Sequence, residues 1–211
     1  LKNFKNIFKK YFNLQKIILS SVGKLDEDVV NYIKSQFQTE IITHKSKFPF
    51  TNLYSTPETL GIDRMVLAAG ATLMHPNQNR LIIDAGTCIT YDFVNSEDQY
   101  LGGAISPGIK IRYKSLNNYT SKLPLLSLSE EFDIIGNSTK SAIHSGVING
   151  VLFEIEGFIS QYSLKNQDLT IILTGGDAEF LAKRLKSTIF ANSNFLLESL
   201  NILSIYLNEN D

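Results

Sequence analysis

One short stretch, residues 81–93, constrains the fold more than any other part of the chain. It reads LIIDAGTCITYDF, a β-branched run followed by a turn and a second run of alternating apolar residues, and this pattern predicts a β-hairpin. The turn carries Asp84, which can hold a cation, and Thr87, which can donate to a phosphate oxygen. Gly86 lets the backbone approach a ligand closely. Such a turn suits a nucleotide-phosphate site, although Asp and Gly also occur together in ordinary hairpin turns.

Strand and helix patterns alternate before this hairpin. Residues 16–22 (KIILSSV) predict a buried strand, Asp26 opens an amphipathic helix, and a second strand follows at residues 40–43. Such alternation implies parallel pairing in an α/β layer. A polar loop at residues 46–56 leads to a helix at residues 63–74, and the polar stretch after that helix is the predicted domain boundary. We therefore expect domains at residues 1–77 and 78–211.

The chain begins with a lysine-rich segment, and residues 1–16 predict an amphipathic basic helix that packs its aromatic face on a sheet. After the hairpin we expect a strand at residues 99–105, where Gly102 and Gly103 accommodate either a bulge or a ligand. A long helix capped by Ser138 then reaches about residue 165. Its small residues, Ala142, Gly146 and Gly150, permit close approach of another element from the same subunit or a partner. A buried strand at 169–173 and a helix at 194–207 complete the chain.

Composition excludes several classes of protein. The chain has 211 residues, 43% of them hydrophobic, and a formal net charge of -1, so we expect a globular protein without a nucleic-acid partner. No apolar run approaches the length of a bilayer span, which predicts no membrane partner. The single cysteine, Cys88, excludes an internal disulfide and fits the reducing cytoplasm. We expect Cys88 to be a small buried hydrophobe and His144 to be a packing or capping group.

Further motifs accompany the Asp84 turn. They are Gly61-Ile62-Asp63-Arg64, YLGGAISPG at residues 100–108, Leu123-Pro124, Gly136-Asn137-Ser138-Thr139 and Thr174-Gly175-Gly176. In this order and spacing, from about Ile17 to the C-terminus, the chain resembles the type III pantothenate kinases. The resemblance implies two ribonuclease-H-like domains of the acetate and sugar kinase, heat-shock and actin superfamily, with ATP in the cleft between them. It also implies transfer of the γ-phosphoryl group of ATP to pantothenate, which is the first step of coenzyme A synthesis.

The resemblance also implies a role for each motif. Asp63 would be the general base on the pantothenate hydroxyl, and Asp84 would bind K⁺ or NH₄⁺. ATP would bind with Mg²⁺, its phosphates against Thr87 and Gly86. The enzyme would be a homodimer, because the family's counterpart of Thr139 reaches pantothenate across the subunit interface. The residues expected to hold pantothenate are Tyr54, Gly61, Ile62, Asp63, Arg64 and Thr139.

Some features depart from the family pattern. The family usually has alanine at the position of Ile62 and threonine or alanine at Cys88 and Ile89. Its first phosphate loop, D-x-G-N-T, does not occur before Lys16. We therefore expect the N-terminal domain to lack its first strand or strands, and these 211 residues alone to be inactive. Two alternatives stay open: a non-catalytic ligand-binding or regulatory protein of the same fold, and a sugar kinase, against which Tyr54 and the Gly-x-Asp-Arg stretch argue.

Overall fold

The computed structural model describes residues 6–8, 11, 13–23 and 26–210. Most of the predicted basic helix at residues 1–16 lies outside these ranges. A six-stranded sheet forms the centre of the molecule, and its strands follow the order β3-β6-β5-β4-β7-β8. The strands are β3 (Thr51–Asn52), β4 (Asn79–Ala85), β5 (Cys88–Val94), β6 (Gln99–Pro107), β7 (Leu169–Thr174) and β8 (Phe190–Ala191).

The topology of this sheet identifies the fold. Strands β4, β5 and β6 form an antiparallel meander, while β7 runs parallel to β4 and β8 runs parallel to β7. A meander with two parallel strands beside its first member is the strand order of the ribonuclease-H fold. The predicted α/β class is therefore confirmed. Strand β3 extends the sheet at its edge by pairing in parallel with β6. The predicted loop at residues 46–56 therefore contains a short strand.

The predicted hairpin at residues 81–93 forms between β4 and β5. Ala85 pairs with Ile89, so Gly86, Thr87 and Cys88 lie between them, and of these Gly86 and Thr87 belong to neither strand. The register shifts between Phe93 and Val94, opposite Gly102, whose φ is +105°. A Cβ on Gly103 would lie 1.5 Å from the Tyr91 carbonyl oxygen. The double glycine thus accommodates a β-bulge and a close strand approach, which is the first of the two predicted alternatives.

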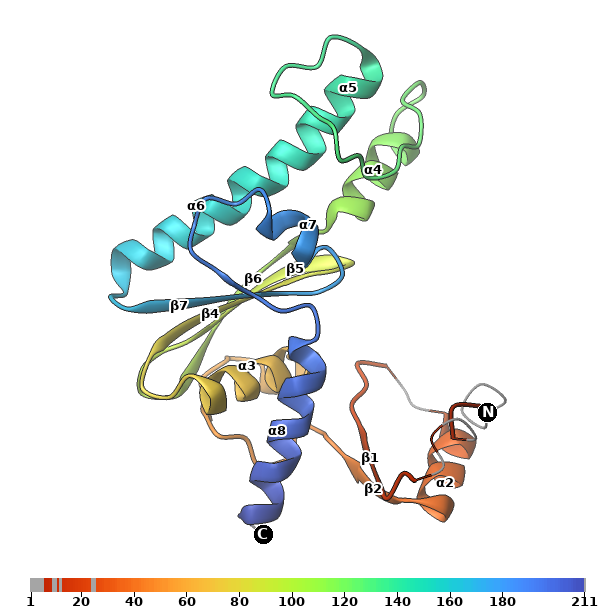
Figure 1. The fold of residues 1–211 in the computed structure, drawn as a ribbon, viewed down its shortest axis with the longest axis vertical. Coiled ribbons are helices and arrows are strands. Elements are labelled where there is room, and N and C mark those ends of the chain that lie inside the picture. Colours follow the sequence, from red (N-terminus) through yellow and green to blue (C-terminus); the bar gives the residue numbers. More distant parts are fainter. Residues whose placement is uncertain (1–5, 9–10, 12, 24–25, 211) are drawn as a thin grey trace.

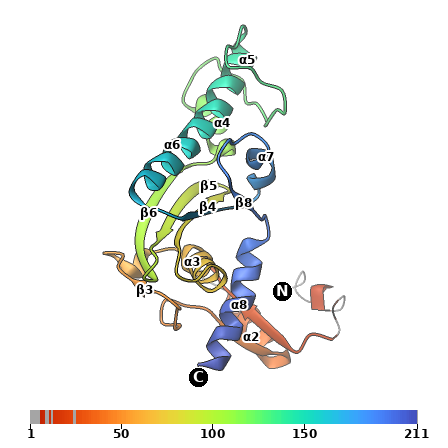
Figure 2. The ribbon, with the colours of Figure 1, turned by 60° about the vertical axis from the view of Figure 1, so that its left-hand side comes forward.

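Helices cover both faces of the sheet (Figures 1 and 2). On one face α3 (Ile62–Met74) packs against α8 (Phe195–Glu209), and a Cβ on Gly70 would lie 1.9 Å from Ser199 Oγ, so the two helices are in close contact. The other face carries α4, α5, a π-helical turn, α6 and α7, which bury a core that includes Ile83, Ile148 and Val151. The bounds on this face are α4 (Ile109–Asn118), α5 (Thr139–His144), η2 (Ser145–Asn149), α6 (Gly150–Lys165) and α7 (Ala178–Ala182).

The long helix predicted from Ser138 to about residue 165 is confirmed. Ser138 closes a capping box with Ser141, and the helix continues to Lys165 through the π-helical turn. By length and hydropathy this stretch would be able to cross a membrane, which corrects the prediction that no apolar run is long enough. It packs on the sheet, with 44% of its most apolar window buried. His144 is buried against the Tyr113 hydroxyl at 2.8 Å, as expected of a packing group.

A smaller unit precedes the large sheet. Strands β1 (Lys16–Leu19) and β2 (Gln38–Ile41) pair in parallel, and α2 (Glu27–Gln36) is capped by Asp26, which accepts from the Asp28 N–H at 2.9 Å. Lys16 joins this unit to α8 by donating to Ser204 Oγ at 2.9 Å. Although β3 and α3 precede residue 77, they pack against the large sheet. The domain division between residues 77 and 78 stays a prediction.

Candidate active site

The first turn of α3 presents Asp63 to the sheet. Gly61 is the N-cap residue, and a Cβ there would lie 2.4 Å from Asp63 Oδ1, so the glycine makes room for the carboxylate. Asp63 is half-buried, and its Oδ1 accepts from the Arg64 N–H at 2.9 Å. The helix therefore begins at Ile62 without a side-chain cap on its N-terminus, and Asp63 lies in its first turn.

Asp84 lies close enough to Asp63 for the two charges to interact. It stands near the end of β4, on the sheet face that α3 covers, opposite Thr90 in β5 and Thr174 in β7. Burial, together with the charges of Asp63 and Asp92, raises the pKa of Asp84 to about 6. Gly175 passes so near that a Cβ would lie 2.4 Å from Asp84 Oδ1. The result is a crowded, negatively charged cluster at this end of the sheet.

Thr174 adds an oxygen beside this carboxylate. It pairs with Asp84 in the parallel ladder, so both side chains are on the same face of the sheet. Its side chain is 2% exposed, and its hydroxyl oxygen has no hydrogen-bond partner. Buried hydroxyl groups are normally paired, and an orphaned one beside a carboxylate is suited to a cation. Among the residues that the structure describes, no three His, Cys, Asp or Glu side chains are grouped to hold a metal ion.

Arg64 is buried, although it follows Asp63 at the start of a helix. Its Nε donates to Asp92 Oδ1 at 2.8 Å, and its Nη2 lies 2.7 Å from the same oxygen. Burial by itself lowers the pKa of Arg64, but the hydrogen bond and charge of Asp92 outweigh it, and the net shift is upward. Tyr54 lies over the guanidinium, with its ring centroid 5.9 Å from Cζ. Arg64 is thus a fixed cation beside an aromatic ring.

The turn formed by Gly86 and Thr87 lies against Gly108, the residue that precedes α4. Gly108 donates from its N–H to the Thr87 carbonyl at 3.0 Å, and a Cβ on Gly108 would lie 2.2 Å from the Gly86 carbonyl oxygen. This contact fixes the turn, while the side chain of Thr87 stays exposed. Cys88 is also exposed, contrary to the expectation of a buried hydrophobe. It lies at the first position of β5, on the face shared with Thr90 and outside the packed core.

Sequence comparison assigns this arrangement to a family. The family model for type III pantothenate kinase matches residues 2–161. Type III pantothenate kinases from Flavobacterium johnsoniae and Bacteroides fragilis are 56% and 39% identical, cover 100% and 99% of this chain, and are themselves covered to 86% in both cases. The chain belongs to the type III pantothenate kinases. It is therefore an enzyme that phosphorylates pantothenate with ATP in coenzyme A synthesis, and neither alternative, the sugar kinase nor the non-catalytic protein, is favoured.

A solved structure agrees on the fold of this pantothenate kinase. A Campylobacter jejuni protein, described as a Baf family transcriptional activator, aligns over 99% of this chain and 89% of its own with a TM-score of 0.66. At 22% sequence identity the likeness shows the fold alone.

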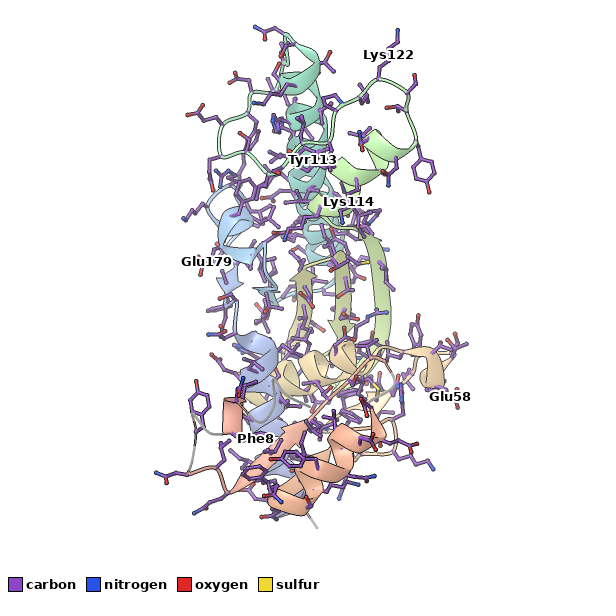
Figure 3. The ribbon with its side chains drawn as sticks, turned by 90° about the vertical axis from the view of Figure 1, so that its right-hand side faces the viewer. Phe8, Glu58, Tyr113, Lys114, Lys122 and Glu179 are labelled. Atoms are coloured by element: carbon purple, nitrogen blue, oxygen red, sulfur yellow. The ribbon has the colours of Figure 1, made fainter. Side chains whose placement is uncertain are left out.

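Thr139 does not join the other predicted site residues of the kinase. It is the exposed first residue of α5, on the opposite sheet face from α3 (Figure 1). Figure 3 shows the same separation, because Tyr113 on α4 lies far from Glu58, which stands in the short helix η1 (Pro57–Thr59) before α3. Thr139 lines a groove of about 650 Å³ together with Arg112, Leu116, Leu123, Ala142 and Gly146. Within one subunit, the structure brings together Tyr54, Gly61, Asp63 and Arg64, with Asp84 in electrostatic reach of Asp63 and Gly86 beside Asp84.

Asp92 is a residue of the site that sequence reasoning missed. It carries a charge on the strand of the predicted hairpin, between the buried residues Tyr91 and Phe93. The signal was present, because a carboxylate on a strand whose two faces are both covered must find a cationic partner. Which cation it meets depends on the position of α3, whose Arg64 is 28 residues away in the sequence.

Proposed function

We propose that Asp63 is the general base that accepts the proton of the pantothenate hydroxyl during phosphoryl transfer. The observation that carries this proposal is the position of its carboxylate in the first turn of α3, where it accepts from the backbone N–H of Arg64 and lies within electrostatic reach of Asp84. Phosphoryl transfer needs one carboxylate near the attacking hydroxyl, while positioning and charge neutralisation supply most of the rate.

Arg64 and Tyr54 are proposed to hold pantothenate, together with the backbone of Gly61 and Ile62. The guanidinium lies near the Tyr54 ring, and the backbone N–H of Arg64 donates to Asp63 Oδ1, so one substrate molecule can contact all three residues. Its two contacts with Asp92 use Nε and Nη2, so Nη1 is directed away from that edge. A planar guanidinium fixed on one edge is suited to donate to substrate oxygens on another.

For ATP, we assign the phosphates to the Gly86 and Thr87 turn and the monovalent cation, K⁺ or NH₄⁺, to Asp84. Three observations support the cation: the half-buried carboxylate, the neighbouring charges that raise its pKa, and the unpartnered Thr174 hydroxyl. Mg²⁺ bound to the triphosphate supplies charge neutralisation for the reaction. Because the described residues hold no cluster of three metal-ligating side chains, we assign no protein ligand to Mg²⁺.

The functional enzyme is proposed to be a cytoplasmic homodimer in which Thr139 of one subunit completes the pantothenate site of the other. Two observations support the dimer. Thr139 lies away from Asp63 in its own subunit, and a Cβ on Gly146 would meet no atom within 4 Å, so this face of the helix is open. A two-fold interface would place the same helix of both subunits together.

The role of Asp63 is tested by Asp63→Asn in a coupled assay with ATP and pantothenate. Loss of a general base is expected to lower kcat by about two to four orders of magnitude, with an unchanged melting temperature. Asp133→Asn is the matched control, because Asp133 is exposed and lies on the opposite sheet face, in the loop before α5. Turnover of Asp63→Asn within a few-fold of the control enzyme would remove Asp63 from this role.

A further inference from the structure

Asp92 is a buried carboxylate of β5 on the sheet face that α3 covers. Its side chain has no exposed surface. Oδ1 accepts from Nε of Arg64 at 2.8 Å, lies 2.7 Å from Nη2 of the same guanidinium, and accepts a short hydrogen bond from the Tyr100 hydroxyl. Oδ2 accepts from Thr90 Oγ1 at 3.1 Å. Both oxygens are therefore engaged by donors from α3, β5 and β6.

Stability alone is a poor explanation for this ion pair. Taking two charges out of water costs several kcal/mol per ion, and buried pairs are often replaced by apolar residues without loss of stability. The surroundings would suit an apolar side chain at position 92, since Ile82 is directly opposite Asp92 in the sheet and is fully buried in the core beneath α3. A charge retained in such a place calls for a role in orienting its partner.

Asp92 holds its partner, Arg64, along one edge of the guanidinium. Both contacts to Asp92 use the Nε and Nη2 edge of Arg64, and the Tyr54 ring lies at 5.9 Å from Cζ. Tyr54 also meets Tyr100 edge to face, with ring centroids 6.1 Å apart. Asp92 thus connects Arg64 to Tyr100, and the Tyr100 ring contacts Tyr54, the second residue proposed to hold pantothenate.

We propose that Asp92 is a positioning residue for pantothenate, which fixes the guanidinium of Arg64 in the orientation that receives the substrate. Tyr100 and Thr90 in turn donate hydrogen bonds to Asp92, so the residues that support Arg64 extend into the sheet. The inference rests on the proposed role of Arg64. It adds that substrate affinity depends on a carboxylate that does not touch the substrate.

The test is the isosteric variant Asp92→Asn, with KM for pantothenate and KM for ATP measured separately. Loss of a charge-assisted contact is expected to raise KM for pantothenate by about 10- to 100-fold. KM for ATP should stay within about twofold, because the Gly86–Thr87 turn precedes β5 and Asp92 lies towards the far end of that strand. Equal rises in both constants, or no rise in KM for pantothenate in a folded variant, would overturn the proposal.

A second variant with a smaller change tests the proposal if Asp92→Asn does not fold. Tyr100→Phe removes one donor to Asp92 and leaves the ion pair, so KM for pantothenate should rise by about 2- to 10-fold. Its matched control is Tyr91→Phe, which removes a hydroxyl that donates to Glu154 Oε1 at 2.9 Å on the opposite face of the sheet. The control should lose comparable thermal stability with an unchanged KM for pantothenate. If the two variants behave alike, the role of Asp92 is structural only.

A double-variant cycle separates this proposal from the one on which it rests. If Arg64→Gln leaves KM for pantothenate unchanged, the proposed role of Arg64 is wrong. If Arg64→Gln raises KM but Asp92→Asn does not, only the positioning role fails. When both raise KM, Asp92→Asn should add less than about twofold in the Arg64→Gln background, because Asp92 would act through Arg64 alone. If the two increases in KM for pantothenate are fully additive in the double variant, Asp92 does not act through Arg64 and the proposal is wrong.

Discussion

Removing the charge of Asp84 should stabilise the folded protein at neutral pH, although Asp84 is proposed to serve the reaction. Burial and the charges of Asp63 and Asp92 raise its pKa from 3.8 to about 6. A carboxyl group with a raised pKa binds its proton more tightly in the folded state than in the unfolded chain. Its ionisation therefore destabilises the fold, and Asp84→Asn removes that penalty while it keeps the shape of the side chain.

The size of the effect follows from the two pKa values. A separation of about two pH units corresponds to about 3 kcal/mol, and the partial exposure of the carboxylate reduces this to about 2–3 kcal/mol. Below pH 3.8 the group is protonated in both states and contributes nothing. The penalty grows as the pH rises through the interval to about 6, and is constant above it. At pH 5 the stabilisation should be about half of its value at pH 7.5.

The measurement is urea unfolding of the wild type and of Asp84→Asn at both pH values, in a buffer whose only monovalent cation is choline. Other groups cancel in the difference between the two proteins. Addition of K⁺ should then stabilise the wild type, since a bound cation offsets the negative charges, and leave the variant unchanged. Two results would refute the reasoning: a variant that is less stable than the wild type at pH 7.5, or equal responses of both proteins to K⁺.

Two further predictions concern glycines. Gly175→Ala should lower the free energy of unfolding by about 1–3 kcal/mol and reduce the response to K⁺, because Gly175 has φ +94° and an added Cβ would press on Asp84. Gly176→Ala is its control, since a Cβ there meets nothing within 4 Å, and equal losses in the two variants would contradict this. Gly146→Leu should preserve the subunit fold but yield monomers in light scattering, with weaker pantothenate binding. A fully active Gly146→Leu dimer would argue against the proposed interface.

Local sequence signals determined much of the fold and part of the site. The hairpin at residues 81–93, the cap at Asp26 and the cap at Ser138 all form as predicted, because each depends on neighbours within a few residues. The contact between Gly61 and Asp63 is equally local, because glycine leaves room for the carboxylate to fold back. The order of the glycine-bearing motifs was sufficient to predict the family, which the comparisons confirm.

Tertiary structure decided which of these residues meet. Arg64 and Asp92 are 28 residues apart, and only the packing of α3 on the sheet joins them. The same packing brings the charge of Asp63 to Asp84, whose raised pKa cannot be inferred from the turn sequence alone. Cys88 is exposed because it lies at the start of its strand, at the margin of the packed core, which strand periodicity does not reveal. The two sides of a sheet look alike in a sequence, and the elements that cover them determine which side chains share a site.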